Sequence, residues 1–402
     1  MTSQDRPCYG IRLTLQLSRI VQTIYFDYNA TTPLDPEVRE AMLPYLGPVY
    51  GNPSSIHSLG RQARVQLDDA RDRAASVLAC RPSELAFTSG GTESNNLAIL
   101  GSVRALRHKG THLIASPTEH PAVLRCFDYL ARHEGCQVSF LPVDREGHVD
   151  PEDVSRTLRP DTVLVSVMRA NNETGTLQPV SAIGALCRDR GVLFHTDAVQ
   201  SFGKEPFGRI DDFQADLVSL CAHKFHGPKG SGVLYVRSPH RLAALLLGGP
   251  QENEIRAGTE NLAGIVGLVT ALERFLDPPV FPETKLGSLT NRLQESLRQV
   301  PGVTPVSPLE RLSNTVSFTV AGCDSLSLLA ALDIEGFCAS SGSACSAGSI
   351  EPSHVLLAQG YDRDAASSFV RFSLGRDSTE GEVVFLAEVF GSLISRIQSA
   401  GR

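Results

Sequence analysis

The apolar positions of this chain form short runs that alternate with segments of helical spacing from Ile24 onward. Short apolar or β-branched runs predict buried strands, and apolar residues at intervals of three and four predict helices. The predicted strands and helices follow one another as Glu84–Thr88 and Glu93–Lys109, His112–Ser116 and Ala122–Glu134, Val163–Met168 and Val180–Arg190, then Leu193–Asp197. This alternation predicts an α/β fold with a mostly parallel sheet that helices cover on both faces.

The last third of the chain has a different pattern. Two helices are expected at Leu262–Leu276 and Leu286–Val300. Further regular segments are expected at Thr315–Thr319, Leu326–Ile334, Val370–Leu374 and near Gly381–Gln398. We therefore expect a second, smaller α/β domain, and the proline-rich stretch Asp277–Pro282 marks a joint.

Composition and charge exclude several classes of protein. The chain has 402 residues, of which 42% are hydrophobic and 20% charged, as in ordinary globular proteins. Its 37 basic and 44 acidic side chains leave a formal charge of −7, so we expect no nucleic-acid partner. No apolar stretch is long enough to cross a membrane, so no membrane partner is expected either. The 9 cysteines lack CxxC spacing, which predicts no metal site and indicates a reducing, cytoplasmic location.

The residues after the predicted strands are the candidates for a binding site, because ligands of open parallel sheets lie beyond the carboxyl ends of the strands. After Glu84–Thr88, the small residues Ser89–Thr92 lead directly into a helix, whose free backbone N–H groups suit a phosphate. A tight turn that requires glycine explains the same residues equally well.

Three further side chains follow predicted strands. Asp197 could cap the next helical segment or, as a buried acid, pair with a partner. Lys224 could be solvated, or desolvated enough to form a Schiff base. His120 could cap a helix at the surface or stack on a ring. Because a lysine, an acid and a phosphate seat are the set that pyridoxal phosphate requires, we expect this cofactor.

A series of ordered motifs makes a family resemblance specific. The motifs are Tyr25–Pro33, Tyr50–Ser55, Phe87–Asn96, Ala170–Gly175, Ala222–Gly230, Arg256–Asn261, Ser340–Cys345 and Val370–Arg376. Together they resemble the cysteine desulfurases, enzymes of the class V aminotransferase type that use pyridoxal phosphate and supply sulfur for iron–sulfur clusters. The resemblance runs from Ile24 to the C terminus. It implies fold type I of the pyridoxal-phosphate enzymes, with a mostly parallel seven-stranded sheet in a large domain beside a smaller α/β domain.

The resemblance also implies domain boundaries. Residues 1–23 would be an N-terminal extension, and Asp5 fits a targeting peptide poorly. Residues 24–53 would be the first part of the small domain, 54–262 the large cofactor-binding domain, and 263–402 the second part of the small domain.

The family's site residues carry over to matching positions of this chain. Lys224 would bind the cofactor covalently, and Asp197 would pair with its pyridine nitrogen. His120 would stack on its ring, and Gln200 would contact its phenolic oxygen. Its phosphate would be seated by Gly91, Thr92, Cys221 and His223, with Thr259 reaching over from the second subunit of a homodimer. The α-carboxylate of L-cysteine would be bound by Asn29, Asn172 and Arg371, with Asn172 also lying against the cofactor.

Cys345 is the nucleophile that the resemblance implies. It lies in the run of small residues Ser340–Ser349, which packs little and is expected to be mobile. Lys224 would remove the substrate's α-proton, and the Cys345 thiolate, which His120 could help to ionise, would attack the substrate sulfur. Alanine and a Cys345 persulfide would result. The run resembles the long-loop branch of the family, which hands sulfur directly to scaffold proteins. A core cysteine in a flexible loop is the alternative.

Two departures from the family pattern qualify the match. Cys221 stands where a phosphate-contacting serine is common, and a thiol is the poorer donor, so weaker cofactor retention is expected. Asn253 and Glu254 replace the usual basic residue and glycine, which puts the local turn in question.

Alternative functions remain open at this point. They are a selenocysteine lyase or another β-lyase with the same cofactor, and a non-catalytic subunit for docking or sulfur relay. The expected partners are L-cysteine, a second copy of the chain, and an iron–sulfur scaffold or other sulfur acceptor.

Overall fold

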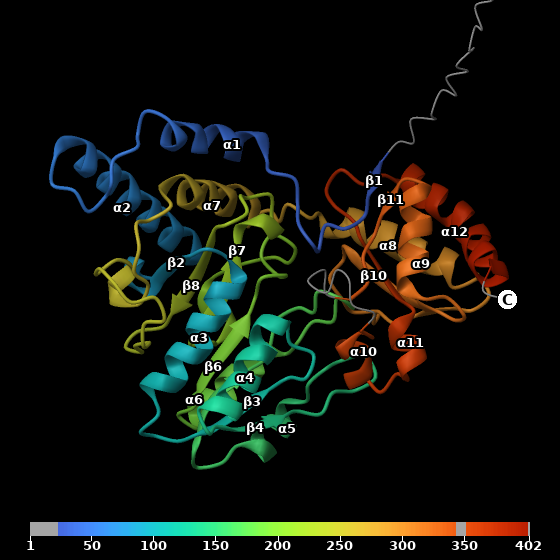
Figure 1. The fold of residues 1–402 in the computed structure, drawn as a ribbon, viewed down its shortest axis with the longest axis horizontal. Helices are drawn as coiled ribbons and strands as arrows, with labels where there is room; N and C mark the ends of the chain where they lie inside the picture. Colours follow the sequence, from blue (N-terminus) through green and yellow to red (C-terminus); the bar gives the residue numbers. More distant parts are fainter. Residues whose placement is uncertain (1–22, 343–350, 401–402) are drawn as a thin grey trace, which may run out of the picture.

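A computed structural model describes residues 23–342 and 351–400 (Figure 1). The strands are β1 (Ile24–Tyr25), β2 (Leu85–Thr88), β3 (His112–Ala115), β4 (Gln137–Phe140), β5 (Thr162–Ser166), β6 (Leu193–Asp197), β7 (Leu217–Cys221), β8 (Gly232–Val236), β9 (Val303–Pro305), β10 (Thr315–Val320), β11 (Phe337–Cys338) and β12 (Phe369–Ser373). The α-helices are α1 (Pro36–Met42), α2 (Ser58–Leu78), α3 (Gly91–Ala105), α4 (Pro121–His133), α5 (Pro151–Thr157), α6 (Val180–Asp189), α7 (Leu262–Phe275), α8 (Glu283–Leu297), α9 (Ser325–Ile334), α10 (His354–Ala358), α11 (Arg363–Ser367) and α12 (Glu380–Ala400). Short 3-10 helices are η1 (Leu43–Leu46), η2 (Pro82–Glu84), η3 (Ile210–Phe213), η4 (Ala222–Lys224) and η5 (Glu252–Glu254).

A seven-stranded sheet forms the centre of the larger part of the molecule. Its strand order is β2-β8-β7-β6-β5-β3-β4. Strand β8 runs antiparallel to β2 and β7, whereas the strands from β7 to β4 pair in parallel. The predicted α/β class with a mostly parallel sheet is therefore confirmed.

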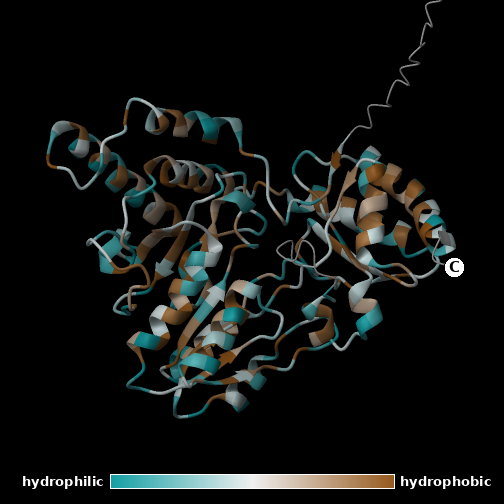
Figure 2. Cartoon of the chain, viewed as in Figure 1, coloured by the Kyte–Doolittle hydropathy of each residue, from teal (hydrophilic) through white to brown (hydrophobic). Residues whose placement is uncertain are grey.

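Helices cover both faces of this sheet because successive strand residues point to opposite sides. Leu113 and Ala115 of β3 belong to a core that includes residues of α3 and α4. Ile114, between them, belongs to a core that includes residues of α2, α6 and α7. Figure 2 shows apolar residues along the strands of this central sheet, between the two helical layers. Since helices bury both faces of the sheet, a polar site can form at the edge where the carboxyl ends of the parallel strands meet.

A second group of elements contains a three-stranded antiparallel sheet in the order β12-β10-β9, and the parallel pair β1–β11. Helices α8, α9 and α12 pack with these strands and with one another (Figure 1). This smaller α/β part contains both the first and the last segments of the described chain. The exact domain boundaries stay a prediction, and α7, which they assign almost entirely to the small domain, packs against α1 and α2.

Several elements of the structure, among them α2 and β8, are absent from the predicted set. Strand β8 enters the sheet between β2 and β7 in the opposite direction to both. A local apolar run does not reveal its direction in a sheet, because neighbouring strands are chosen by tertiary packing. None of the helices in residues 23–342 and 351–400 is long and apolar enough to cross a membrane.

Candidate active site

A cavity of about 200 Å³ lies at the carboxyl ends of the parallel strands, between the large sheet and the smaller part. Its walls come from the ends of β6 and β7, the start of α3, the segments after β3 and β5, the N-terminal segment and β12. The predicted site residues that line it are Asn29, Gly91, Thr92, His120, Asn172, Asp197, Gln200, Cys221, His223, Lys224 and Arg371. The structure therefore brings together eleven positions that span most of the sequence.

Two predicted residues are not in this wall. Thr259 is exposed in the loop before α7 and does not line the cavity of its own chain. Cys345 falls in residues 343–350, outside the part of the chain that the structure describes. Their roles stay predictions.

Lys224 lies in η4, directly after β7, and its side chain is half-buried. Its Nζ donates to the backbone oxygens of Asn29 at 2.6 Å and Ala30 at 2.9 Å. Burial lowers the pKa of the Lys224 ammonium, and the nearby Arg371 guanidinium lowers it further. A lowered pKa increases the neutral fraction of the amine, which is the nucleophilic form.

Asp197 ends β6 and is only 5% exposed. Its Oδ2 accepts a hydrogen bond from Nδ2 of Asn95 at 2.6 Å, and its Oδ1 accepts one from the backbone N–H of Val199 at 3.0 Å. The prediction that Asp197 caps a helix is wrong, because a turn and no helix follows it before η3; its buried partner is Asn95. Asn95, which the sequence analysis did not assign to the site, lies on the first turns of α3 and fixes the carboxylate from the opposite side.

The start of α3 forms the expected anion seat. Gly90 is the N-cap with φ 147°, a conformation that favours glycine, and α3 begins at Gly91. A Cβ added to Gly91 would lie 2.8 Å from Cγ2 of Val199. The first backbone N–H groups of a helix have no partner inside the helix, so this bare turn can present them to an anion.

Cys221 lies at the end of β7 beside this turn and is 1% exposed. Burial raises the pKa of its thiol to about 11, although Lys224 and the backbone N–H of Gly91 lower it. The thiol is therefore protonated near neutral pH. It can act only as a weak hydrogen-bond donor in the cavity.

His120 is the N-cap of α4, and its Nδ1 accepts a hydrogen bond from the backbone N–H of Ala122 at 3.1 Å. Burial lowers the pKa of the His120 imidazole, while Asp197 raises it. Because Nδ1 is an acceptor, the proton of the neutral ring lies on Nε2. The residue is both a helix cap and part of the cavity wall.

A cluster of side chains on the other side of the cavity surrounds Arg371 of β12. The guanidinium donates from Nη1 to the backbone oxygen of Asn172 at 2.7 Å and from Nη2 to Oδ1 of Asp27 at 2.6 Å. Asn29 donates from Nδ2 to the same backbone oxygen of Asn172 at 3.1 Å. Nε of Arg371 is buried and has no hydrogen-bond partner among the described residues. The cluster can therefore clamp an additional carboxylate, and Asp27 is a member that the sequence patterns did not single out.

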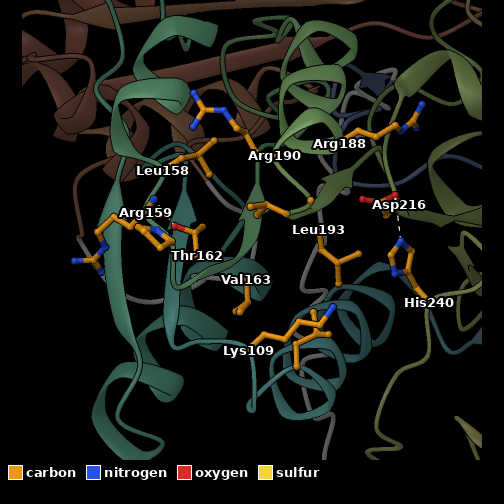
Figure 3. A pocket seen from close by; sticks show the side chains of 14 residues that line it. Lys109, Leu158, Arg159, Thr162, Val163, Arg188, Arg190, Leu193, Asp216 and His240 are labelled. Atoms are coloured by element: carbon orange, nitrogen blue, oxygen red, sulfur yellow. Dashed lines mark hydrogen bonds and ion pairs between the residues drawn. The ribbon is translucent and has the colours of Figure 1, made fainter.

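A second cavity, of about 450 Å³, lies at the opposite ends of β5 and β6 (Figure 3). Basic residues on its wall include Lys109, Arg159 and Arg188. The guanidinium groups of Arg159 and Arg188 already donate to Oε1 of Gln137 at 3.0 Å and of Gln214 at 2.6 Å. None of the predicted site residues lines this cavity.

Known proteins match the chain over nearly its whole length. The class V aminotransferase family matches residues 24–386. The cysteine desulfurase IscS of Dictyoglomus turgidum is 43% identical over 380 residues, which cover 94% of this chain and 95% of that protein. The cysteine desulfurase NifS of Azotobacter vinelandii is 45% identical over 363 residues, which cover 90% of each chain.

Solved structures agree with these sequence matches. A NifS-like protein superposes with a TM-score of 0.86 at 36% identity, covering 93% of this chain and all (100%) of that one. A structure titled as SspA in complex with cysteine has a TM-score of 0.78 at 35% identity, covering 89% of this chain and 100% of that one. Identity at this level over full-length chains, together with the strand-end lysine and acid in one cavity, confirms the resemblance read from the motifs: the chain belongs to the class V aminotransferases and, among them, to the cysteine desulfurases.

Proposed function

We propose that the chain binds pyridoxal 5′-phosphate in the cavity at the carboxyl ends of the strands and converts L-cysteine to L-alanine, leaving the sulfur as a persulfide on Cys345. The observation that carries the proposal is the composition of one cavity wall, where the amine of Lys224 shares a cavity with Asp197, the start of α3 and Arg371. An amine, a carboxylate, an anion seat and a carboxylate clamp are the four groups that this cofactor and an amino acid require.

The residues present fit the cofactor in charge and in shape. Lys224 is half-buried and has a lowered pKa, as an amine that forms a covalent bond to an aldehyde needs. Asp197 already accepts hydrogen bonds from Asn95 and Val199, so a bound pyridinium N–H would meet a carboxylate of fixed orientation. Gly91 keeps the first turn of α3 open, because a Cβ there would press on Val199.

Each residue then has a defined task in the reaction. When bound, pyridoxal phosphate supplies an electron sink for the negative charge that develops at Cα of the substrate. Arg371 would hold the substrate carboxylate with the part of its guanidinium that lines the cavity. The Nζ of Lys224 would accept the α-proton. His120, whose proton lies on Nε2, would offer an acid or base at the cavity wall.

The sulfur leaves by transfer to an enzyme thiol. The Cys345 thiolate would form an S–S bond to the substrate sulfur while the C–S bond of the substrate breaks. The electron pair of the C–S bond stays on Cβ, which takes up a proton, and alanine results. The assignment of Cys345 rests on the match of Ser340–Cys345 to the family motif. The same match favours the long-loop branch.

Partners follow from the same proposal. We expect a homodimer in which the exposed Thr259 of each chain reaches the phosphate seat of the other. We expect the persulfide sulfur to pass to an iron–sulfur scaffold or to another acceptor protein. A cytoplasmic location is expected because the cysteines of the described chain are free thiols.

The test compares the wild type with Cys345→Ala on L-cysteine, and Cys338→Ala, a half-buried free thiol in β11, is the matched control. We expect Cys345→Ala to bind the yellow cofactor but to make neither alanine nor persulfide, while Cys338→Ala behaves as the wild type. Alanine production by Cys345→Ala at the wild-type rate would refute the nucleophile. A wild-type protein that stays colourless with pyridoxal phosphate would refute the cofactor. Sulfide and selenide release, measured on cysteine and selenocysteine side by side, distinguishes the proposed activity from a selenocysteine lyase.

A further inference from the structure

A second lysine is buried beside the cavity, and the proposed reaction does not use it. Lys204 lies in the turn that follows β6 and is 2% exposed. A fully buried lysine is rare in proteins unless its amine has partners. Among the described residues Lys204 forms no salt bridge to a carboxylate; its Nζ donates to Oδ1 of Asn29 at 2.6 Å and to Oε1 of Gln200 at 2.5 Å. The Nζ of Lys204 also lies over the ring of Phe281, 5.2 Å from the ring centroid.

These two contacts determine which way two side-chain amides point. Nζ of Lys204 donates to both amides, so the atoms that face it are oxygens. The Nε2 of Gln200 must then point away from Lys204. It donates one hydrogen to the backbone oxygen of Asn29 at 2.9 Å, the same oxygen that accepts from Nζ of Lys224. Gln200 also lines the cavity, so its second N–H is available to a ligand there.

Two contacts set this orientation, the one from Lys204 to Oε1 and the one from Nε2 to the backbone oxygen of Asn29. An amide turned by 180° exchanges its oxygen and nitrogen with little change in shape. Without Lys204, only the contact to Asn29 would keep the nitrogen of Gln200 on its present side, so the donor toward the cavity would be held less firmly. The phenolic oxygen of pyridoxal phosphate carries negative charge when bound, and such an oxygen needs a donor.

We propose that Lys204 is a positioning residue that holds the Gln200 amide as a hydrogen-bond donor toward the phenolic oxygen of the cofactor, and that it holds Asn29 in the substrate clamp by the same means. The inference rests on the proposed function, since it requires pyridoxal phosphate in this cavity. Burial lowers the pKa of Lys204 well below its ordinary value, and Lys224 lowers it further. A neutral amine still has two N–H donors, which is enough for the two amide oxygens that face it.

The first test is cofactor binding by Lys204→Met, with Lys229→Met as the control. Lys229 is an exposed lysine in the turn after η4, so the control removes a nearby charge without removing buried hydrogen bonds. Apo protein is titrated with pyridoxal phosphate, and the dissociation constant and the visible absorption maximum of the bound cofactor are recorded. We expect about tenfold weaker binding and a shifted maximum for Lys204→Met, because a misoriented buried amide costs about that factor. Lys229→Met should match the wild type.

The second test asks whether Lys204 acts through Gln200. In a Gln200→Ala background, Lys204→Met should weaken cofactor binding further by less than about threefold, since the amide that it orients is gone. A full tenfold effect in that background would overturn the inference, as would an unchanged dissociation constant and spectrum in the single variant.

Gln200→Glu provides a readout that leaves Lys204 in place. A carboxylate at this position keeps an oxygen toward Lys204 but presents oxygen instead of an N–H to the cavity, so we expect weaker cofactor binding. Cofactor binding by Gln200→Glu that is as tight as that of the wild type would mean that no donor is needed at this position, and it would overturn the inference even if Lys204→Met does not fold. These measurements use no substrate, so they are independent of whether wild-type protein makes alanine and persulfide. Failure of the wild type to bind the cofactor would instead refute the proposed function.

Discussion

The salt bridge between Arg71 and Glu252 gives a quantitative prediction about the edge of the large sheet. Strand β2 is the outer strand of that sheet, and it leads directly into the anion seat at Gly91. Glu252 of η5 accepts from Nη2 of Arg71 at 2.6 Å and from the backbone N–H of Phe87 at 2.8 Å. Arg71 in turn donates to the backbone oxygen of Leu85 at 2.7 Å. The pair therefore satisfies edge-strand groups that have no neighbouring strand.

We expect Glu252→Ala to lower the free energy of unfolding by about 3–5 kcal/mol, because it leaves a buried guanidinium and a buried backbone N–H without their partner. The side chain of Glu252 is 2% exposed and that of Arg71 is 15% exposed, so water cannot replace the lost contact. The matched control is Glu273→Ala. Glu273 pairs with Arg73 at 2.6 Å, but the two side chains are 34% and 36% exposed, so about 0–1 kcal/mol is expected there.

The assay is urea unfolding of the apo proteins, followed by circular dichroism, with a titration of pyridoxal phosphate in parallel. Because β2 carries the anion seat, Glu252→Ala should also weaken cofactor binding, whereas Glu273→Ala should not. A loss of stability below about 1 kcal/mol for Glu252→Ala, or equal losses for the two variants, would refute the reasoning that burial sets the strength of the pair.

Three further predictions follow from single residues. Cys221→Ser should lower the dissociation constant of pyridoxal phosphate about two- to tenfold, because a hydroxyl is a better donor than a buried thiol; Cys187→Ser, in the core, should destabilise the protein without that gain. Burial raises the pKa of Glu119 well above its ordinary value of about 4.5, and Asp197 raises it further, so the wild type loses stability as pH rises above about 4.5 toward the folded-state pKa. The stability gained by Glu119→Gln should therefore grow by up to about 1.4 kcal/mol per pH unit in that window, and a difference between the two proteins that is constant with pH would contradict this. Glu254→Gly should raise the free energy of unfolding by about 0.5–1 kcal/mol, since Glu254 has φ 67°, and an unchanged urea midpoint would count against strain at this turn.

The turn around Glu254 also answers a question raised by the sequence. Asn253 and Glu254 depart from the family pattern, and the chain nevertheless adopts φ values of 57° and 67° there. The neighbouring Glu252, anchored on Arg71 and Phe87, holds the turn in this conformation. Asparagine adopts a left-handed backbone readily, whereas glutamate does not, so the buried contacts of Glu252 impose this conformation on Glu254.

Local sequence patterns were sufficient to predict those parts of the site that lie on a single strand and the turn or helix that follows it. Asp197, Lys224 and the turn Ser89–Thr92 each follow an apolar run, and the rule that ligands lie at the carboxyl ends of parallel strands placed them in one site. The family motifs added Asn29, Asn172 and Arg371 by matching residues. No spacing within the chain could have shown that these three lie together.

What the sequence by itself determined is the α/β class, the identity of the strand-end groups and the family, because periodicity and turn residues act over a few positions along the chain. Only the tertiary structure decided the contacts between distant segments. Arg371 pairs with Asp27 across 344 positions, and Lys204 becomes buried against Asn29 and Gln200 although its own neighbours in sequence are those of an ordinary turn. The physical reason is that burial and hydrogen-bond geometry arise where separate elements pack. A lysine that looks like a surface residue in its local sequence can therefore be buried in the fold and orient side chains of the site.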